Sequence, residues 1–344
     1  MPVTAGSLPR YIGQRLLLVI PMMWVLLTVV FVLLRVAPGD PVSAAVGGKL
    51  DPAVIEARRE ALGLNRPMIV QYLEYLGQVA RFDFGQAISD NRAVLEIVRD
   101  NGGATLTLSL GAFLFALAIG IPLGLVAGRH RDTVRDVVIR IFGVITYAAP
   151  IFFVGLMMQM FVARPLGLPT SGIASPRTQF TVSSQPITHI LLLDAALLGN
   201  WTAFWDVLVH HVLPCVTLGL LVCGVFIRLV RVNLLQTLQA DYVEAARARG
   251  IPERRVLREH AFRNALVPVV TVIGLQAATL LGGAVLTENT FNWPGLGTQL
   301  VHYITARDYI AVQGLVTFFA VIVVVISVAV DVINALIDPR VRYR

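Results

Sequence analysis

Six uncharged, apolar blocks are the feature that most constrains this chain. Each is 19 to 23 residues long and contains no Asp, Glu, Lys or Arg. About 20 helical residues cross a hydrocarbon core roughly 30 Å thick. Backbone polar groups must be satisfied within lipid, and the alternating ten-residue pattern of a transmembrane barrel does not occur, so the helix is the spanning form that fits. The blocks are 16–34, 106–128, 141–163, 207–227, 265–287 and 309–330.

Composition supports this interpretation. Of the 344 residues, 56% are apolar and only 14% are charged, which leaves too little polar surface for a soluble domain of this size. We therefore expect an all-α polytopic membrane protein with six transmembrane helices. The first block is longer than a usual signal-peptide core and no small-x-small cleavage site follows it, so we expect a retained helix.

Basic residues are sorted by segment. If the N-terminus lies inside, the inner segments hold 17 Lys and Arg residues and the short outer loops hold 3, whereas the long outer segment 35–105 holds the other 8. Long loops carry little orientation information, so the short ones decide. The pattern predicts that both termini are cytoplasmic. The net charge of +7 is thereby explained as a topology signal, and no nucleic-acid partner is expected.

The blocks divide the chain into three parts. Residues 1–36 hold the N-terminus and first helix, and 37–105 form an extracytoplasmic segment. Residues 106–344 form a core of five helices with a cytoplasmic segment at 232–266. Helical stretches are predicted around 52–62 and 67–81, because Pro52 and Pro67 suit a first helical turn. The outer loop 164–206 is rich in Ser, Thr and Pro and is expected to be irregular.

Several kinds of chemistry have no sequence support here. The single lysine, Lys49, is followed by leucine and lacks the phosphate-binding frame G-x-x-x-x-G-K-[ST]. No G-x-S-x-G or H-E-x-x-H occurs, and the adjacent His210 and His211 point in different directions on a helix. Cys215 and Cys223 are eight residues apart on one predicted helix, about 12 Å, too far for a disulfide. We predict no catalytic residue, no metal site and no cofactor bound by this chain.

The cytoplasmic stretch 241–252 has the signals of a short helix. Asp241 can cap it, and Glu244 three residues later can complete a capping box. Gly250 suits the position just past the helix end, and Pro252 suits the first turn of a second helix that reaches about Leu266. A helix of about eight residues is not stable alone, so it must dock on something.

The small side chains of this helix suggest how it docks. Ala245, Ala246 and Ala248 would let a partner surface approach closely, and Arg247 and Arg249 could pair with acidic groups there. From physical reasoning alone, an ordinary surface loop between two spans is an equal alternative.

A family resemblance decides between these alternatives. The string EAARARG at 244–250, followed by FRNALVP at 262–268, resembles the EAA motif of ABC-importer permeases. With Asp241 and Tyr242 before it, the segment is similar to the dipeptide/oligopeptide (Dpp/Opp, peptide/nickel) branch. Three further strings resemble that branch. They are APGDP at 37–41, FDFG at 82–85 with Ser89, and ENTFNWPGLG at 288–297.

The resemblance implies a type I ABC-importer fold and a permease subunit of a peptide importer in the cell membrane. It implies that the short helix is a coupling helix in a groove of an ATPase subunit. Its residues are Asp241, Tyr242, Glu244, Ala245, Ala246, Arg247, Arg249 and Gly250. It also implies a second permease of the same family as heterodimer partner, ATPase subunits that carry ATP and Mg, and an extracytoplasmic substrate-binding protein.

Some alternatives stay open at this point. The same class of importer could carry nickel complexes or haem instead of dipeptides or oligopeptides. An ion-coupled secondary transporter would need a charged residue within the spans, and the six blocks contain none. An intramembrane enzyme would need a nucleophile and a base, and no such pair is readable in the blocks. The chain itself is not expected to be an enzyme.

Polar and aromatic residues provide candidate transport sites. Polar groups within membrane spans usually face the bundle interior, as a peptide pathway or as packing contacts. The pathway candidates are Tyr147, Gln159, Gln276, Thr279, Gln313 and Thr317. Candidates for an outer gate, or for a structural turn beside one, are Glu288, Phe291, Trp293 and Pro294.

Two further patterns concern helix packing and shape. Gly274, Ala278 and Gly282 recur every four residues, a spacing that allows close helix contact within the chain or with a second permease. Pro150 and Pro214 lie within the third and fourth blocks and are expected to kink them.

Overall fold

The computed structural model describes residues 8–36, 43 and 51–337, and every regular element among them is a helix. The APGDP string at 37–41 lies outside the described residues. The first elements are α1 (Leu8–Val36), α3 (Pro52–Ala61), α4 (Met68–Ala80), α5 (Val94–Arg129), α6 (Val134–Ala148), α7 (Ile151–Met158), the π-helix η1 (Gln159–Ala163) and α8 (Arg164–Leu166). The later elements are α9 (Pro176–Ser183), α10 (Leu191–Leu197), α11 (Trp201–Leu238), α12 (Asp241–Ala248), α13 (Glu253–Arg255), the π-helix η2 (Val256–Phe262), α14 (Arg263–Ala265), α15 (Val267–Thr290), α16 (Leu296–Thr305) and α17 (Tyr309–Ile337).

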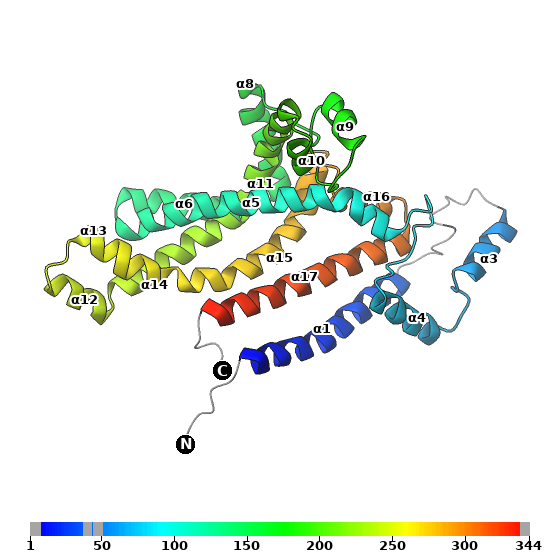
Figure 1. Ribbon diagram of the computed structural model, residues 1–344, viewed down its shortest axis with the longest axis horizontal. Helices are drawn as coiled ribbons and strands as arrows, with labels where there is room; N and C mark the ends of the chain where they lie inside the picture. Colours follow the sequence, from blue (N-terminus) through cyan, green and yellow to red (C-terminus); the bar gives the residue numbers. More distant parts are fainter. Residues whose placement is uncertain (1–7, 37–42, 44–50, 338–344) are drawn as a thin grey trace, which may run out of the picture.

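The long helices run roughly along the longest axis of the molecule (Figure 1). Among the described residues, four helices are long and apolar enough to cross a membrane, namely α1, α5, α11 and α17, and the bent pair from α6 to α8 would make a fifth. The all-α polytopic membrane fold is thus confirmed. The fifth predicted block, 265–287, coincides with the 24-residue α15, which is not among those helices, so the count of six stays a prediction.

The third predicted span is broken rather than continuous. The helices on the two sides of the break differ in direction by 109°. Ala149, which caps α6, has an extended backbone with ψ of 135°, and Pro150 begins the next helix. The residue before a proline avoids the helical region and the proline ring clashes with the preceding turn. The expected kink at Pro150 is therefore present, whereas Pro214 lies inside one continuous helix, α11.

The outer segments are more helical than the sequence suggested. The stretches predicted near 52–62 and 67–81 are α3 and α4, with Pro52 at the first position of α3 and Pro67 just before α4. The loop 164–206 was expected to be irregular, but it contains α8, α9 and α10. Ser175 caps α9 by accepting a hydrogen bond from the Thr178 amide. A serine followed by proline is a strong start signal for a helix, and composition alone concealed it.

The core lies between α5, α11 and α15. Small residues let the backbones of α5 and α11 approach closely. A Cβ on Gly219 would lie 2.6 Å from the Ala112 carbonyl oxygen, and one on Gly124 would lie 2.8 Å from the Ile227 carbonyl oxygen. Gly274 of the predicted small-residue stripe packs on Val330 of α17, whereas nothing lies near Gly282. That stripe thus serves contacts within the chain at Gly274 and leaves an open position at Gly282.

The bundle has two distinct ends (Figure 1). The helix α12 lies at one end, together with the start of α1 and the end of α17. The helices α3, α4 and α16 lie at the opposite end. The segments 51–105 and 232–266, which the charge pattern assigns to opposite sides of the membrane, therefore lie toward opposite ends, whereas α8, α9 and α10 of the loop 164–206 lie beside the long helices between those ends (Figure 1).

Candidate functional site

The short helix α12 is formed as predicted, from Asp241 to Ala248. Its N-cap is Ala240, which offers no side-chain cap, so the predicted capping box is wrong: Asp241 is already the first helical residue. Both acidic side chains still lie in the first turn, where the helix dipole favours negative charge. At the other end, Gly250 has φ of +73° and its amide donates to the Arg247 carbonyl at 2.9 Å, as expected for a left-handed C-terminal turn.

One face of α12 packs on the helical segment that follows it in the chain, from α13 to α14. Val243 and Ala246 are buried against Val256, with Leu238 and Ile251 at the edge. Ala246 is only 5% exposed. The expectation that its small side chain offers close approach to a partner is therefore wrong. This face was assigned to a partner because sequence spacing does not tell which side of a short amphipathic helix its own chain will cover.

The opposite face of α12 is open. Tyr242 is 45% exposed, and the acidic and alanine side chains beside it point away from the chain. The exposed members are Asp241, Tyr242, Glu244, Ala245, Ala248 and Arg249. We call these six residues the outward face of α12. It combines one aromatic ring, two alanines and charges of both signs, a composition suited to a polar protein surface.

Arg247 turns back onto the chain rather than outward. Its Nη2 lies 2.9 Å from Oε1 of Glu253, and its Nε lies 3.1 Å from Oε2. These hydrogen bonds raise the pKa of Arg247 and lower the pKa of Glu253 below its usual value. The predicted pairing of Arg247 with a partner's acidic group therefore has an internal competitor, which Arg249 does not have among the described residues.

The second helical segment begins at Glu253 with Pro252 as its N-cap, one position before the first turn predicted for this proline, and it is not a uniform α-helix. It consists of α13, the π-helix η2 and α14. Its inner side packs Ala261 and Ala265 against Leu234 of α11. The segment from α13 to α14, which we call the platform of α12, is thereby packed directly on α11.

A buried ion pair, which the sequence analysis missed, ties the first turn of α6 to α11. Asp136 is 0% exposed. Its two oxygens accept from Nε and Nη2 of Arg231 at 2.6 and 2.8 Å, and Oδ2 also accepts from the Asp132 amide at 3.1 Å. The available signal was a pair of acidic residues, Asp132 and Asp136, in an otherwise basic segment. Removing either partner would leave an uncompensated buried charge.

The opposite end of the molecule is organised around Glu288. This carboxylate is 0% exposed and accepts from Thr105 Oγ1 at 2.7 Å and from the Thr298 amide at 3.0 Å. A Cβ on Gly295 would overlap the carboxylate, so the glycine is required for the loop to close on it. Thr105 Oγ1 in turn accepts from the Leu296 amide at 2.8 Å.

The aromatic residues of the same loop are also buried. Trp293 and Phe291 are 0% and 1% exposed. The Trp293 indole donates to the Ala104 carbonyl at 3.0 Å and meets the ring of His211 edge-on at 4.5 Å. Of the four gate candidates only Pro294 is exposed. The arrangement favours the structural turn over a gate that moves by these side chains.

The motif FDFG at 82–85 belongs to the same end. Phe84 packs edge-on against Phe318 at 5.7 Å, and Gly85 has φ of +87°. Ser89 donates from its amide and its hydroxyl to Oδ2 of the buried Asp308, at 2.8 and 2.9 Å. The Tyr303 hydroxyl donates to Asp90 at 2.8 Å, and burial together with that carboxylate raises the pKa of Tyr303.

These contacts join segments that are far apart in the chain. We call them the outer knot, consisting of residues 82–90, Thr105 and 288–308. Two strings of the family resemblance, FDFG with Ser89 and ENTFNWPGLG, are therefore parts of one structural unit.

The six pathway candidates do not form one wall. Gln159 is held by the carbonyls of Thr170 and Thr290 at 2.9 and 3.1 Å, and Gln276 is buried in α15. Tyr147 of α6 and Thr279 of α15 are exposed. The structure thus leaves Tyr147 and Thr279 as the candidates that face open space.

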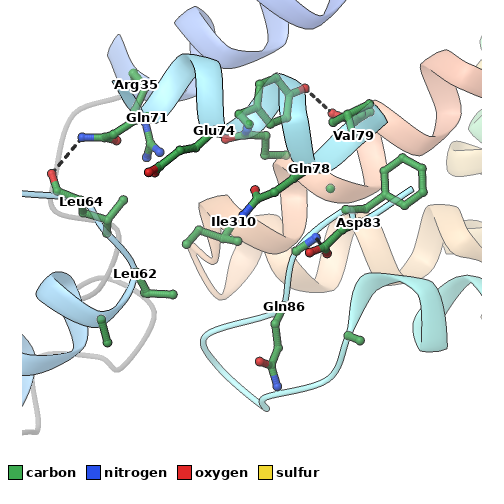
Figure 2. Close-up of a pocket in the computed structure, with 18 residues that line it drawn as sticks. Arg35, Leu62, Leu64, Gln71, Glu74, Gln78, Val79, Asp83, Gln86 and Ile310 are labelled. Atoms are coloured by element: carbon green, nitrogen blue, oxygen red, sulfur yellow. Dashed lines mark hydrogen bonds between the residues drawn. The ribbon is translucent and has the colours of Figure 1, made fainter. Parts of the chain in front are cut away.

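The remaining two candidates, Gln313 and Thr317 of α17, face the outer segment instead. They line a pocket of about 500 Å³ between α17 and α4, shown in Figure 2. Thr317 lies 2.6 Å from the Tyr75 hydroxyl, within hydrogen-bond distance. Gln71, on the opposite wall, donates to the Leu64 carbonyl at 3.0 Å. Gln313 and Thr317 therefore face the chain's own segment 51–105.

An extensive apolar face remains uncovered on α6, α7 and α15. Leu275 and Leu286 of α15 are 68% and 49% exposed, and Thr279 and Gly282 lie at helical spacing between them. On α6 and α7 the exposed apolar side chains include Val144, Ile145, Tyr147, Phe152 and Phe153. We call this surface the open face. Lipid or another membrane helix can cover such a face.

Taken together, these features define a polytopic membrane component with a short, half-exposed helix at one end and a closed structural knot at the other. Residues 120–343 match the family described as binding-protein-dependent transport system inner membrane component, and residues 8–110 match the N-terminal part of such components. The chain belongs to the family of binding-protein-dependent transport system inner membrane components.

Curated relatives agree over nearly their full length. The chain is 37% identical over 336 residues to the di/tripeptide transport system permease protein DppB of Pseudomonas aeruginosa, covering 97% of this chain and 99% of the relative. It is 38% identical over 337 residues to the dipeptide transport system permease protein DppB of Escherichia coli K12, with the same coverage. It is 33% identical over 336 residues to the glutathione transport system permease protein GsiC of Salmonella choleraesuis, covering 97% of this chain and 99% of the relative. The resemblance to the dipeptide branch is thus confirmed.

Proposed function

We propose that this chain is a membrane-spanning subunit of an ATP-driven importer of short peptides. Its family membership and the dipeptide, di/tripeptide and glutathione systems named for its relatives support the substrate class. The single observation that carries the mechanism is the outward face of α12. An eight-residue helix held to its own chain by one side presents the other side to a partner.

The proposal includes three kinds of partner. ATPase subunits dock on the outward face of α12 and hold ATP and Mg, while this chain binds no cofactor and breaks no bond in the substrate. A second permease of the same family covers part of the open face and lines the pathway with it. A substrate-binding protein delivers the peptide at the opposite end, near the outer knot. Nucleic acid has no part in this assembly.

The orientation follows from charge. The end that carries α12 holds most of the basic residues in short segments, and the described ends of α1 and α17 lie on that same side (Figure 1). The positive-inside rule places this side in the cytoplasm. Both termini are then cytoplasmic, and α3, α4 and the outer knot face the extracytoplasmic side.

The coupling would operate by rigid contacts. When the ATPases close on nucleotide, they shift α12. Val243 and Ala246 transmit the shift to Val256, and Ala261 and Ala265 pass it to Leu234 of α11. Because α11 packs along α5 and α15 in the core, movement at its cytoplasmic end changes the cavity between the two permeases.

The test places a tryptophan on each side of α12. Ala245→Trp adds bulk to the outward face, so we expect loss of peptide uptake and of ATPase co-purification, with a normal amount of folded permease. Ala246→Trp overfills the inner contact and should destabilise the subunit itself by about 1–3 kcal/mol. Ala57→Trp, at an exposed position of α3, is the matched control and should transport normally.

Uptake of a labelled dipeptide in cells and pull-down of the ATPase report on both steps. If Ala245→Trp binds its ATPase and transports at the wild-type rate, the outward face is not the docking surface. Gly250→Val should also abolish uptake, because a β-branched residue is strongly strained at positive φ.

A further inference from the structure

A groove near α12 is not used by the proposed mechanism. It has a volume of about 260 Å³ and opens between the end of α5, the end of α11 and η2. Its walls are apolar and its rim is basic. The wall includes Leu125, Leu234 and Phe262, and the rim consists of Arg129, Arg254 and Arg258. One wall residue comes from each of the three elements, so the groove exists only in the folded chain.

The three rim arginines have no side-chain hydrogen bond or ion pair within the part of the chain that the structure describes. Their neighbours Arg247 and Arg255, in contrast, are paired with glutamates at 2.9 and 3.2 Å. Of the three, only Arg129 interacts electrostatically with a nearby carboxylate of the described chain, that of Glu253, which Arg247 already pairs. Three guanidinium groups around one cavity attract a multivalent oxygen anion, since guanidinium donors match phosphate geometry.

The groove also lies at a particular depth. Arg129 is the last residue of α5, and α5 is one of the helices long and apolar enough to cross a membrane. The rim therefore sits where an apolar span gives way to a polar surface. Phospholipid phosphates occupy that level of a bilayer, and basic pockets between membrane helices bind anionic headgroups.

We propose that this groove binds an anionic phospholipid of the surrounding leaflet. Its phosphate lies among Arg129, Arg254 and Arg258, and its upper acyl carbons lie against the apolar wall. The volume holds a headgroup and the start of a chain, so the rest of the lipid stays in the bilayer. The apolar wall distinguishes this ligand from a free phosphate ion, which gains nothing from contact with leucine and phenylalanine.

Such a lipid would brace the platform of α12. The groove's floor includes η2, whose first residue, Val256, carries the inner face of α12. A lipid that bridges η2 and α5 adds a contact between α5 and the segment from α13 to α14, which otherwise have few contacts with each other. The leaflet is the cytoplasmic one if the proposed function is right, but binding itself does not depend on transport.

The experiment uses the full chain, purified in neutral detergent together with the subunits that accompany it. Phosphatidylglycerol, phosphatidylcholine and inorganic phosphate are titrated separately, and bound lipid is counted by native mass spectrometry. We expect phosphatidylglycerol to be retained at least about tenfold better than phosphatidylcholine, because each basic group near a membrane surface contributes roughly fivefold in affinity. Millimolar phosphate should not displace it.

Two double variants separate the groove from general charge. Arg254→Gln with Arg258→Gln removes two rim arginines and should reduce phosphatidylglycerol retention about tenfold or more. Arg135→Gln with Arg255→Gln removes the same charge from exposed positions outside the groove and should retain wild-type binding. Phe262→Asn keeps every charge and should weaken lipid retention without changing phosphate binding.

Several results would overturn the proposal. Equal retention in the two double variants would show that no specific site exists. Displacement by inorganic phosphate would assign the arginines to a soluble anion. Unchanged lipid binding in the groove variant, with loss of the co-purified ATPase, would assign them to a protein partner. The wild-type comparison of the two lipids needs no variant, and all readouts are independent of uptake, so failure of the proposed function would appear separately.

Discussion

The two ends of this molecule are held together in opposite ways. At the outer knot, Glu288, Trp293 and Asp308 are fully buried, and their polar atoms are satisfied by segments up to 219 residues away in the chain. At the other end, α12 is held by a small apolar contact with three buried side chains, Val243, Ala246 and Val256, and by the partly exposed ion pair between Arg247 and Glu253. One end is a buried, hydrogen-bonded network, whereas the other is a short helix with a small buried contact.

The difference indicates where movement is permitted. A region whose polar groups are buried and paired opens only at a large cost in free energy, whereas a region with few buried apolar contacts opens locally at low cost. A transporter needs both. The outer knot fixes the positions of α5, α15, α16 and α17, and the weakly held α12 can follow a partner without disturbing them.

The largest expected effect is that of Trp293→Ala in the outer knot. It removes a fully buried ring and the hydrogen bond to the Ala104 carbonyl, so we expect a loss of about 3–5 kcal/mol in the free energy of unfolding. Thermal unfolding of the purified protein in detergent measures it. Tyr242→Ala, at the half-exposed ring on α12, is the matched aromatic control and should change stability by less than about 1 kcal/mol. Equal losses in the two variants would contradict the comparison.

A smaller loss is expected when Glu288 is replaced. Glu288→Leu keeps the bulk but leaves the Thr105 hydroxyl and the Thr298 amide without their acceptor. Each buried unpaired donor costs about 1–3 kcal/mol. Thr105→Val should cost less in the Glu288→Leu background than in the wild type, because it then removes only the hydrogen bond from the Leu296 amide. Additive losses in this double-mutant cycle would show that the two groups are not coupled.

Gly250→Ala tests the support of α12. The residue has φ of +73° and nothing lies near its ideal Cβ, so the substitution introduces backbone strain alone, about 1 kcal/mol. Hydrogen exchange of α12 should accelerate several-fold, while exchange in the outer knot stays unchanged. Gly282→Ala, at an open position inside α15, is the control and should not accelerate exchange in α12.

The smallest effect concerns the ion pair between Arg247 and Glu253. The pKa of Glu253 is lowered by this contact, so its stabilisation is complete above the ordinary glutamate pKa and is lost as the pH falls through the lowered value. Because both side chains are about half-exposed, the contribution is below about 1 kcal/mol. Glu253→Gln should weaken the loss of α12 protection as the pH falls, with protection measured as the exchange rate relative to the intrinsic amide rate at each pH. A variant that keeps the wild-type pH profile would show that another group titrates there.

The elements of this fold were well predicted because hydrophobic blocks and helix punctuation are local properties. Gly250, Pro252 and Pro150 each impose a backbone geometry on their own, and the structure has the predicted turn, helix start and break at these positions. Long apolar blocks likewise leave little choice but a spanning helix.

Three failures at the candidate site concern which surface meets which. Ala246 was expected to face a partner and instead faces Val256, and Arg247 pairs internally with Glu253. Neither contact follows from spacing along α12, because both depend on how the next helix folds back. The burial of Asp136 by Arg231 was missed for the same reason, since the two residues are 95 positions apart.

The break at Ala149 and Pro150 has a mechanical consequence. The half before it, α6, is clamped to α11 through Asp136 and Arg231. The half after it, α7, is seated beside the end of α15, where Gly155 contacts Thr290. No helical hydrogen bonds cross the break, so α6 and α7 behave as two rigid helices joined by a hinge and not as one continuous helix. If α11 tilts α6, the change in direction is therefore taken up at Ala149 and Pro150, and α7 keeps its position beside α15 and the outer knot.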